Sequence, residues 1–405
     1  MNIPFCLPLI DKNVIDKVNY CLNESGWLTS GPIVKEFEEE ISKISHTKYS
    51  VAVNSWTSGA LLLFKLLGLK ETDEVIVPNY TYAATALSVI NHGAKCVLVD
   101  VDDNFTMDIQ DLKSKLNKNT KVIFPVDLGG LPADYEKIKV ILDDFYSINN
   151  KNHSENKFQN LFVRPIIVSD AAHSIGSTIN DIPTPRYADF TIFSFHSVKN
   201  ITTGEGGAIT FQLINDDIEL EIYKELKLLS LNGQTKTALE KTNSGSWEYD
   251  IVTNGLKVNM PDINASIGLS QIIRYKDILL PEREFIYDWY YENLKMHTWA
   301  IIPPKQIGLR KSSCHLFPLR LKGYSAEQRN QLISHLSSMG IGANVHYKPL
   351  SELSYFKKIG FNSSNFPTSL KLYENEISLP IYNGLSKEKV DKISNTIINY
   401  MSNGF

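Results

Sequence analysis

The chain has 405 residues, of which 43% are hydrophobic and 21% are charged. This composition is that of a globular protein and excludes a disordered or fibrous one, and the length predicts two or three domains. The formal net charge of −4 leaves no basic excess to neutralise phosphates, so we expect no nucleic-acid partner.

Targeting and redox signals point to a soluble protein of the cytoplasm. The N-terminal residues 1–18 lack the basic start and continuous apolar run of a signal peptide, and no segment has the roughly 20 apolar residues that span a membrane. No two cysteines form a C-x-x-C pair, and their wide spacing predicts free thiols. The cysteines are Cys6, Cys21, Cys96 and Cys314.

Seven short apolar runs alternate with helical patterns in the first half of the chain. Most of these runs are nearly continuous in Val, Ile, Leu and Phe, which is typical of strands buried on both faces of a mostly parallel sheet. Only ten residues separate the last two runs, so we expect that pair to be antiparallel. The runs cover residues 48–54, 74–79, 94–101, 121–128, 164–172, 189–195 and 206–212.

The pattern changes after residue 212. A polar segment follows and predicts a long loop, and residues 261–294 then read as a long helix with a kink or break at Pro281. The remainder predicts a smaller α+β unit, with strands at 314–321, 340–347 and 377–382 and helices at 325–340 and 386–401. We therefore predict a large α/β domain over residues 1–275 and a small C-terminal α+β domain over residues 276–405.

Ligands of open α/β sheets bind at the carboxyl ends of the strands, so the residues that follow each strand deserve inspection. Ser55, Trp56, Thr57 and Ser58 follow the first strand and lead into a helix, which suits a phosphate group, although a simple helix cap explains them as well. No G-x-x-x-x-G-K-[ST] or G-x-G-x-x-G motif supports an ATP or dinucleotide site.

Three further strands end in residues with suggestive chemistry. Tyr82 could stack on a flat ring or simply pack, and Asp170 could hold a protonated pyridine nitrogen or cap a helix. His173 could bind an adjacent oxygen or be structural. Lys199 precedes a glycine-rich turn and, if buried, would have a lowered pKa and could form a Schiff base; taken alone it resembles an ordinary loop lysine.

A metal site is the weaker interpretation of the acidic string at residues 99–103. Asp100, Asp102 and Asp103 fit a strand end that runs into a turn, and no histidines cluster near them, so we expect no metal. The phosphate-binding turn, the aromatic, the aspartate and the lysine instead all follow strands of one sheet. Together they are what pyridoxal phosphate needs.

The sequence also resembles the DegT/StrS family of sugar aminotransferases, which have the fold-type-I aspartate-aminotransferase architecture. The resemblance extends over nearly the whole chain, and the stretch FSFHSVKNITTGEGGA at 193–208 is its most specific part. The other stretches that carry it lie at 26–40, 52–63, 73–86, 169–176, 255–272 and 345–350.

The resemblance implies a role for each matching position. Lys199 matches the lysine that holds pyridoxal 5′-phosphate and carries protons, Asp170 the partner of the ring nitrogen, and His173 the contact of the ring's phenolic oxygen. Tyr82 matches the stacking aromatic. The positions that match phosphate contacts are Trp56, Thr57, Ser194 and, from the neighbouring subunit, Asn259 with Lys257 beside it.

The family further implies a homodimer with shared active sites, a nucleotide-linked keto-sugar as acceptor, glutamate as donor, and a role in surface-polysaccharide or glycoconjugate biosynthesis. Thr29, Gly31 and His346 are substrate candidates from family position alone. Two departures, Trp56 for a small residue and Asp127 for a common histidine, bear on substrate identity. A sugar dehydratase and a non-catalytic sensor are the alternatives, and the retained Lys199 favours transamination.

Overall fold

The computed structural model describes residues 2–149, 154–213, 215–241 and 247–402. Its centre is a seven-stranded sheet in which five neighbouring strands are parallel and β9 is antiparallel to both β8 and β1. This confirms the predicted mostly parallel sheet and the predicted antiparallel pair. In spatial order the strands are β1 (Ser50–Val53), β9 (Gly207–Phe211), β8 (Phe190–Ser194), β5 (Ile166–Asp170), β4 (Thr120–Ile123), β2 (Glu74–Pro78) and β3 (Lys95–Val99).

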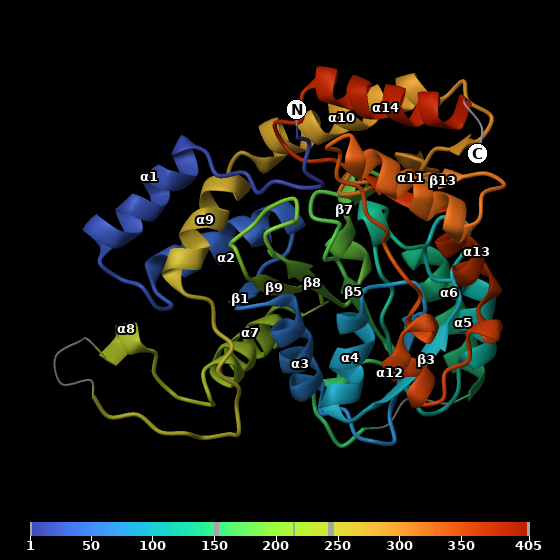
Figure 1. Cartoon of the computed structure of the whole chain (residues 1–405). Coiled ribbons are helices and arrows are strands. Elements are labelled where there is room, and N and C mark those ends of the chain that lie inside the picture. The colour runs from blue at the N-terminus through green and yellow to red at the C-terminus, as the bar shows by residue number, and fades with distance from the viewer. Residues whose placement is uncertain (1, 150–153, 214, 242–246, 403–405) are drawn as a thin grey trace.

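Helices cover both faces of this sheet (Figure 1). Alternate residues of a strand point to opposite faces, so Val51 and Val53 pack in one core with helices α3 and α7 while Ala52 packs in another with α2 and α9. The helices of the first face are α3 (Trp56–Leu67), α4 (Ala83–His92) and α7 (Asp216–Ser230). Those of the other are α2 (Pro32–Ser45), α5 (Ile109–Lys115), α6 (Tyr135–Asn149) and α9 (Asp262–Ile272), with α1 (Lys12–Tyr20) packed on α9.

Helix α7 corrects the prediction of a long loop after residue 212. The Asn215 side chain accepts from the N–H groups of Asp217 and Ile218 and so caps this helix. Its buried residues Ile222, Leu226 and Leu229 keep helical spacing, but the acidic and basic residues between them obscure the pattern. A short helix α8 (Ala238–Lys241) follows on a segment that extends away from the sheet (Figure 1), and residues 242–246 of the predicted loop lie outside the described part.

The predicted long helix is broken, but not at the predicted proline. The break lies at Arg274, where φ is −109° and ψ is 7°, and a π-helical turn at Tyr275–Leu279 leads into α10 (Leu280–Leu294). Pro281 lies in the first turn of α10, directly after the π-helical turn, where the fixed φ of proline is compatible with the helix.

The C-terminal region forms a three-stranded antiparallel sheet of β10 (Ala300–Ile301), β13 (Phe317–Leu321) and β14 (Glu376–Leu379). Its helices are α10, α11 (Ala326–Ser338), α12 (Ser354–Lys358), α13 (Pro367–Asn375) and α14 (Lys387–Ser402). The strand predicted at 340–347 is wrong, since that segment makes only isolated bridges at Ile341 and Asn344. Its residues Asn344, His346 and Tyr347 line a cavity.

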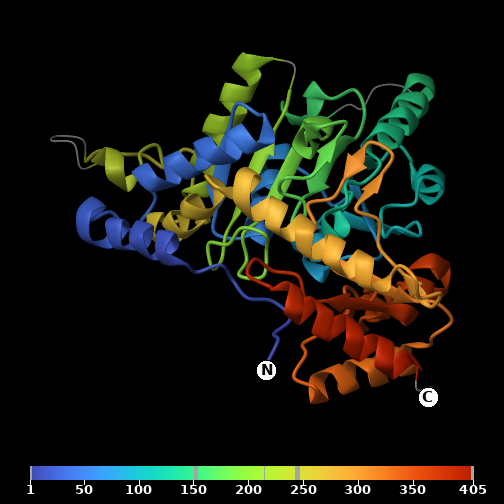
Figure 2. The same ribbon diagram turned by 90° about the horizontal axis from the view of Figure 1, so that it is seen from above.

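Two connections join the first and last parts of the chain. Ile3 exchanges backbone hydrogen bonds of 2.8 Å with Gly340 and Gly342, which places the N-terminus beside the C-terminal helices (Figure 2). A small sheet pairs β6 (Thr178–Ile179) and β7 (Ile182–Pro183) with β11 (Gln306–Ile307) and β12 (Arg310–Lys311). The boundary at residues 275 and 276 stays a prediction. Within the described ranges, no helix has both the length and the apolarity needed to cross a membrane.

Candidate active site

A cavity of about 470 Å³ lies where strands of the central sheet end. The polar residues that follow β1, β2, β5 and β8 all contribute to its wall, as the topology predicts for an open α/β sheet. Eight of the predicted site residues line it: Trp56, Thr57, Tyr82, Asp170, His173, Ser194, Lys199 and His346.

Lys199 lies in the turn after β8, where its N–H donates to the carbonyl of His196 at 2.9 Å. Burial lowers the pKa of its amine to about 8, while the nearby Asp170 acts in the opposite direction. Among the described residues, none makes a hydrogen bond or an ion pair with this amine. A half-buried lysine whose nitrogen is uncommitted can act as a nucleophile near neutral pH.

Asp170 is the last residue of β5 and is only 4% exposed. Its Oδ2 accepts from the hydroxyl of Thr85 at 2.8 Å and its Oδ1 from the N–H of Ala172 at 3.2 Å. Burial raises the pKa of this carboxyl to about 6. The hydrogen bonds from Thr85 and Ala172 and the nearby charge of Lys199 oppose this rise, but no described residue forms an ion pair with Asp170. Its carboxylate is therefore available to a protonated ring nitrogen in the cavity.

His173 is held between the loop at residues 127–131 and the C-terminal region. The Gly129 N–H donates to its Nδ1 at 3.2 Å, its Nε2 lies 3.3 Å from the Tyr347 hydroxyl, and its ring centroid is 4.4 Å from that of His315. Burial lowers its pKa well below the ordinary value, so the ring is neutral. Because Nδ1 accepts a hydrogen bond, the proton lies on Nε2, which can donate within the cavity.

The turn between β1 and α3 forms the end of the cavity that suits a phosphate. Ser55 caps α3 by accepting from the Ser58 N–H at 3.1 Å, and Thr57 and Ser194 line the same end. Gly207 of β9 must lack a side chain here, because an added Cβ would lie 2.8 Å from the backbone nitrogen of Trp56. Strand β9 therefore packs closely against this turn, whose residues Ser55, Trp56 and Thr57 line the cavity.

The Trp56 side chain is directed mainly into the core rather than across the cavity. It is 7% exposed, its Nε1 donates to the carbonyl of Ile192 at 3.1 Å, and it stacks on Phe124 with ring centroids 5.7 Å apart. The large residue at this position therefore anchors the start of α3 to β8. It leaves its backbone, together with Thr57, to meet a ligand.

Three predicted site residues do not line this cavity. Asp262 accepts from the Gly31 N–H at 2.8 Å and donates its own N–H to the Thr29 carbonyl at 3.2 Å, and the Asn259 amide donates to Ser30 at 2.6 Å. Thr29, Gly31 and Asn259 thus lie together in a cluster of their own. The neighbouring Lys257 is bonded to Asn259 and exposed.

Other cavity residues were missed from the sequence. Thr85 orients Asp170, and its place in the first turn of α4, three residues after Tyr82, was a usable signal. Tyr347 bridges Tyr82 and His173, with ring centroids 5.9 Å and 6.2 Å away. His196 and Glu205 also line the cavity, and their side chains lie 3.6 Å apart; nothing local in the sequence marks them.

Asp127, which stands where the family commonly has a histidine, is the centre of a buried hydrogen-bond network and does not line the cavity. Its carboxyl accepts from Ser174 at 2.6 Å and from Tyr135 and the Ala133 N–H at 2.8 Å. Burial raises its pKa to about 6. Because Asp127 begins the loop that carries Gly129, this network supports the position of His173.

The other acidic residues that we considered as metal ligands have structural partners. Asp100 accepts from the N–H groups of Thr368 and Ser369 at 2.8 Å and so holds the start of α13, while Asp102 accepts from Thr106 and closes a turn. In the described ranges, no group of three or more His, Cys, Asp and Glu side chains could hold a metal ion.

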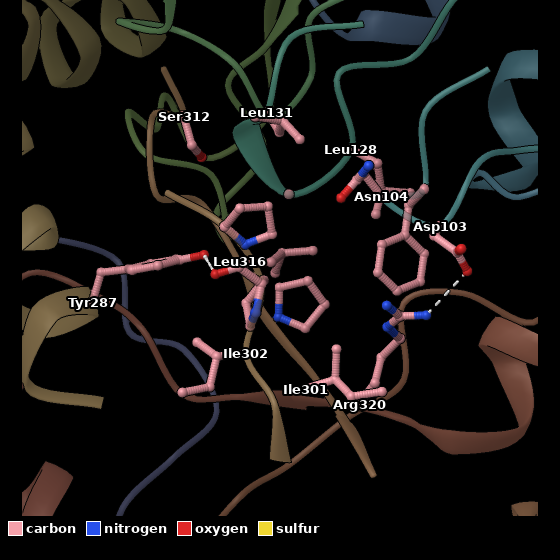
Figure 3. Close-up of a pocket in the computed structure, with 15 residues that line it drawn as sticks. Asp103, Asn104, Leu128, Leu131, Tyr287, Ile301, Ile302, Ser312, Leu316 and Arg320 are labelled. Carbon is pink, nitrogen blue, oxygen red and sulfur yellow. Dashed lines mark hydrogen bonds and ion pairs between the residues drawn. The ribbon is translucent and has the colours of Figure 1, made fainter. Parts of the chain in front are cut away.

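A second cavity of about 140 Å³ is lined in part by Leu128, Gly129 and Leu131, from the loop that contacts His173 (Figure 3). Arg320 and Asp103 pair across its edge at 3.5 Å, and the Tyr287 hydroxyl donates to Pro303 at 2.7 Å (Figure 3). Leu128 and Leu316 make much of its wall apolar. Its lining contains no lysine, so a Schiff base with the cofactor is possible only in the larger cavity.

The larger cavity fits pyridoxal phosphate. It combines an uncommitted amine at Lys199, an unpaired buried carboxyl at Asp170, a neutral ring donor at His173, an exposed aromatic at Tyr82 and an open helix N-terminus. Each of these groups matches one part of that cofactor: the aldehyde, the ring nitrogen, the phenolic oxygen, the ring face and the phosphate.

Comparisons with known proteins identify the family of the chain as a whole. The model of the DegT/DnrJ/EryC1/StrS aminotransferase family matches residues 8–146 and 164–398. The structure of the putative sugar aminotransferase Spr1654 from Streptococcus pneumoniae, in its PMP-form, superposes with a TM-score of 0.94 at 41% identity, over 99% of this chain and 100% of that one. Its PLP-form gives a TM-score of 0.93 at 40% identity over 100% and 99%.

Among curated proteins, the spore coat polysaccharide biosynthesis protein SpsC of Bacillus subtilis is 33% identical over 96% of this chain and 95% of its own. The UDP-4-amino-4,6-dideoxy-N-acetyl-beta-L-altrosamine transaminase of Campylobacter jejuni strain 81-176 is 29% identical over 97% and 96%. The chain is a pyridoxal-phosphate-dependent enzyme and belongs to the DegT/DnrJ/EryC1/StrS aminotransferase family.

Proposed function

We propose that this sugar aminotransferase moves the amino group of glutamate onto the carbonyl carbon of a nucleotide-linked keto-sugar, for a surface polysaccharide or glycoconjugate. The observation that carries the proposal is the presence of the Lys199 amine and the Asp170 carboxyl in one buried cavity. The names of the Campylobacter transaminase and of SpsC support the sugar acceptor and the polysaccharide role.

The cavity residues would divide the work as follows. Lys199 would hold the cofactor covalently and, once released, move a proton between cofactor and substrate carbons, since its lowered pKa of about 8 lets it both take and give a proton near neutrality. Asp170 would keep a proton on the ring nitrogen. Pyridoxal phosphate, when bound, supplies the electrophilic carbon and a ring that delocalises an electron pair.

His173, Tyr82 and the turn at the start of α3 would position the cofactor. The Nε2 proton of His173 would be donated to a ring oxygen, because its Nδ1 is already engaged by Gly129. Tyr82, which is 63% exposed, would cover one face of the ring. Thr57, Ser194 and the backbone of Trp56 would hold the phosphate, and His346 would face the substrate.

We further propose a homodimer in which the cluster of Thr29, Gly31 and Asn259 completes the cavity of a second copy. Residues 247–252 support this, because they expose Trp247 by 76% and Val252 by 56%. Exposed apolar side chains of this kind are typical of an interface.

The test begins with the colour of the purified protein. The holoenzyme should be yellow, L-glutamate should bleach it, and a panel of nucleotide-linked keto-sugars should restore the colour, with the amino-sugar detected by mass spectrometry. Colour that persists with glutamate would contradict transamination and favour a dehydratase or a sensor protein. The panel also identifies the sugar and its nucleotide.

A further inference from the structure

A chain of three side chains leads from a buried carboxyl to the cavity. His346 lines the cavity, and its Nδ1 lies 2.9 Å from the hydroxyl of Ser378. Ser378 is in turn hydrogen-bonded to Oε1 of Glu376, and the other oxygen of Glu376 accepts from the backbone N–H of His346 at 2.9 Å. Glu376 and Ser378 are both 0% exposed, so water does not interrupt the chain.

Two contacts fix the positions of the hydrogen-bonded side chains of His346, Ser378 and Glu376. Asn344 and Ser378 exchange backbone hydrogen bonds of 2.8 Å and 3.1 Å, which fixes the cavity segment against β14. The ring of Phe5 stacks on that of His346 with centroids 5.3 Å apart. With the ring held in this way, the remaining freedom of His346 is which of its nitrogens carries the proton.

We propose that Glu376, acting through Ser378, sets the tautomer of His346 and thereby decides whether its Nε2 donates a hydrogen bond to a substrate oxygen or accepts one. Glu376 and Ser378 are positioning residues, because they reach the substrate only through His346. The inference rests on the proposed function to the extent that it takes His346 to face the substrate.

The two states follow from counting protons along the chain. When Glu376 is protonated, its Oε1 donates to Ser378, Ser378 donates to Nδ1 of His346, and a neutral ring must then carry its proton on Nε2. When Glu376 is ionised, Ser378 donates to the carboxylate and accepts from Nδ1, which leaves Nε2 with a lone pair. No net charge appears on His346 in either state.

The surroundings favour the first state at neutral pH. Burial raises the pKa of Glu376 to about 8, against the opposing effects of its hydrogen bonds with Ser378 and the His346 backbone and of the Arg329 charge on α11. Tyr80 and Tyr347 are the other titratable groups whose pKa Glu376 affects. Burial, together with the positive charge of Lys199, lowers the pKa of His346 to about 3, so this ring stays neutral. The donor form of Nε2 therefore prevails below pH 8 and the acceptor form above it.

Two variants distinguish the two tautomeric states of His346, and a third variant serves as the control. Glu376→Gln keeps a donor toward Ser378 and an acceptor toward His346, so it fixes Nε2 as the donor at every pH. Ser378→Ala breaks the chain. Glu374→Gln makes the same change in an exposed residue of α13, two positions away and outside the chain.

The direct test is nitrogen NMR of the holoenzyme labelled with ¹⁵N-histidine, with the His346 signal assigned by its loss in His346→Gln. Wild type and Glu374→Gln should change from the Nε2-protonated to the Nδ1-protonated pattern as the pH passes about 8. Glu376→Gln should keep the Nε2-protonated pattern throughout, and Ser378→Ala should lose the change. A wild-type tautomer that is constant on both sides of pH 8, or a change that survives in Glu376→Gln, would overturn the proposal.

Kinetics then show which substrate His346 meets. The KM for that substrate should rise up to about tenfold above pH 8 in the wild type but not in Glu376→Gln, which corresponds to one hydrogen bond. Measuring KM separately for L-glutamate and for the keto-sugar shows which of the two substrates carries the oxygen that meets Nε2 of His346. Because the NMR result does not depend on turnover, failure of the transaminase assay and failure of the tautomer change are distinguishable.

Discussion

Gly129 donates its backbone N–H to Nδ1 of His173 at 3.2 Å, and this single bond decides how the histidine can act. The proton of the neutral ring is left on Nε2, which lies 3.3 Å from the hydroxyl of Tyr347 in the cavity wall. The loop that carries Gly129 begins at the buried Asp127, so the supporting network extends far beneath the cavity.

A first prediction follows for His173. His173→Leu should lower pyridoxal-phosphate affinity by up to about tenfold and shift the absorption maximum of the bound cofactor, because a donor to its ring oxygen is lost. His173→Gln, which retains an N–H donor, should behave much like the wild type. Equal effects of the two substitutions in a spectrophotometric titration would contradict the donor role.

Substitution of Asp170 should reduce catalytic activity more than any other substitution except that of Lys199. Asp170→Asn should reduce kcat on the order of 100-fold to 1000-fold, since an amide cannot keep the ring nitrogen protonated. Thr85→Val removes only the hydroxyl that donates to Asp170 at 2.8 Å and should cost about tenfold or less. Steady-state rates of both variants test this order, and a Thr85→Val loss as large as that of Asp170→Asn would refute it.

The raised pKa of Glu376 has a consequence for stability as well as for catalysis. Between the ordinary carboxyl pKa of 4.5 and about 8, the folded chain keeps a proton that the unfolded chain has released. The stabilising contribution is therefore complete below pH 4.5 and declines by about 1.4 kcal/mol per pH unit up to pH 8.

Glu376→Gln does not titrate and should gain stability relative to the wild type across this window. Thermal unfolding midpoints of the two proteins, measured at a series of pH values, should diverge as the pH rises and then stay a constant distance apart. The exposed Glu374→Gln should follow the wild type. A difference between the unfolding midpoints of wild type and Glu376→Gln that stays the same at every pH would contradict the raised pKa of Glu376.

Trp56 provides a test of the start of α3. Trp56→Ala should lower the free energy of unfolding by about 3 to 5 kcal/mol, because it empties the space against Phe124 and removes the bond to Ile192. Trp56→Phe should cost about 1 kcal/mol and keep cofactor affinity, since the backbone that faces the phosphate is unchanged. Denaturant titration and cofactor titration measure the two effects separately.

The shared site can be tested by mixing two defective proteins. Lys199→Ala lacks the lysine expected to hold the cofactor, and Asn259→Ala lacks the residue expected to reach a second copy. A mixed dimer would therefore contain one cavity with both residues intact. Unfolding and refolding the two together should restore activity above the sum of the separate variants. Activity that never exceeds this sum would show that Asn259 serves its own chain or no site at all.

Much of the fold and part of the site can be predicted from the sequence. The continuous apolar runs predict the seven strands because a strand buried on both faces has no polar alternation, and the rule for strand ends then places Asp170 and Lys199 at one edge. Helix α7 was missed because charged residues separate its buried ones. The direction of the Trp56 side chain depends on packing against β8, which no local pattern reports.

The Glu376 chain could not have been predicted from its own segment. The sequence NEISLP at 375–380 reads as an ordinary strand, and its glutamate would be taken for a surface residue. Its burial arises because α11 and the segment at His346 pack against the start of β14, and these elements are distant from it in the sequence. The role of the cluster at Asn259 is expected from family position, and it stays a prediction because it requires a second chain.

The central claim is that the Lys199 amine holds the cofactor, and borohydride reduction of the yellow holoenzyme tests it most directly. Reduction should fix the cofactor irreversibly, and peptide mass spectrometry should find the added mass on the peptide that contains Lys199 and on no other. Label on a different lysine, or a reducible adduct that persists in Lys199→Ala, would contradict the account.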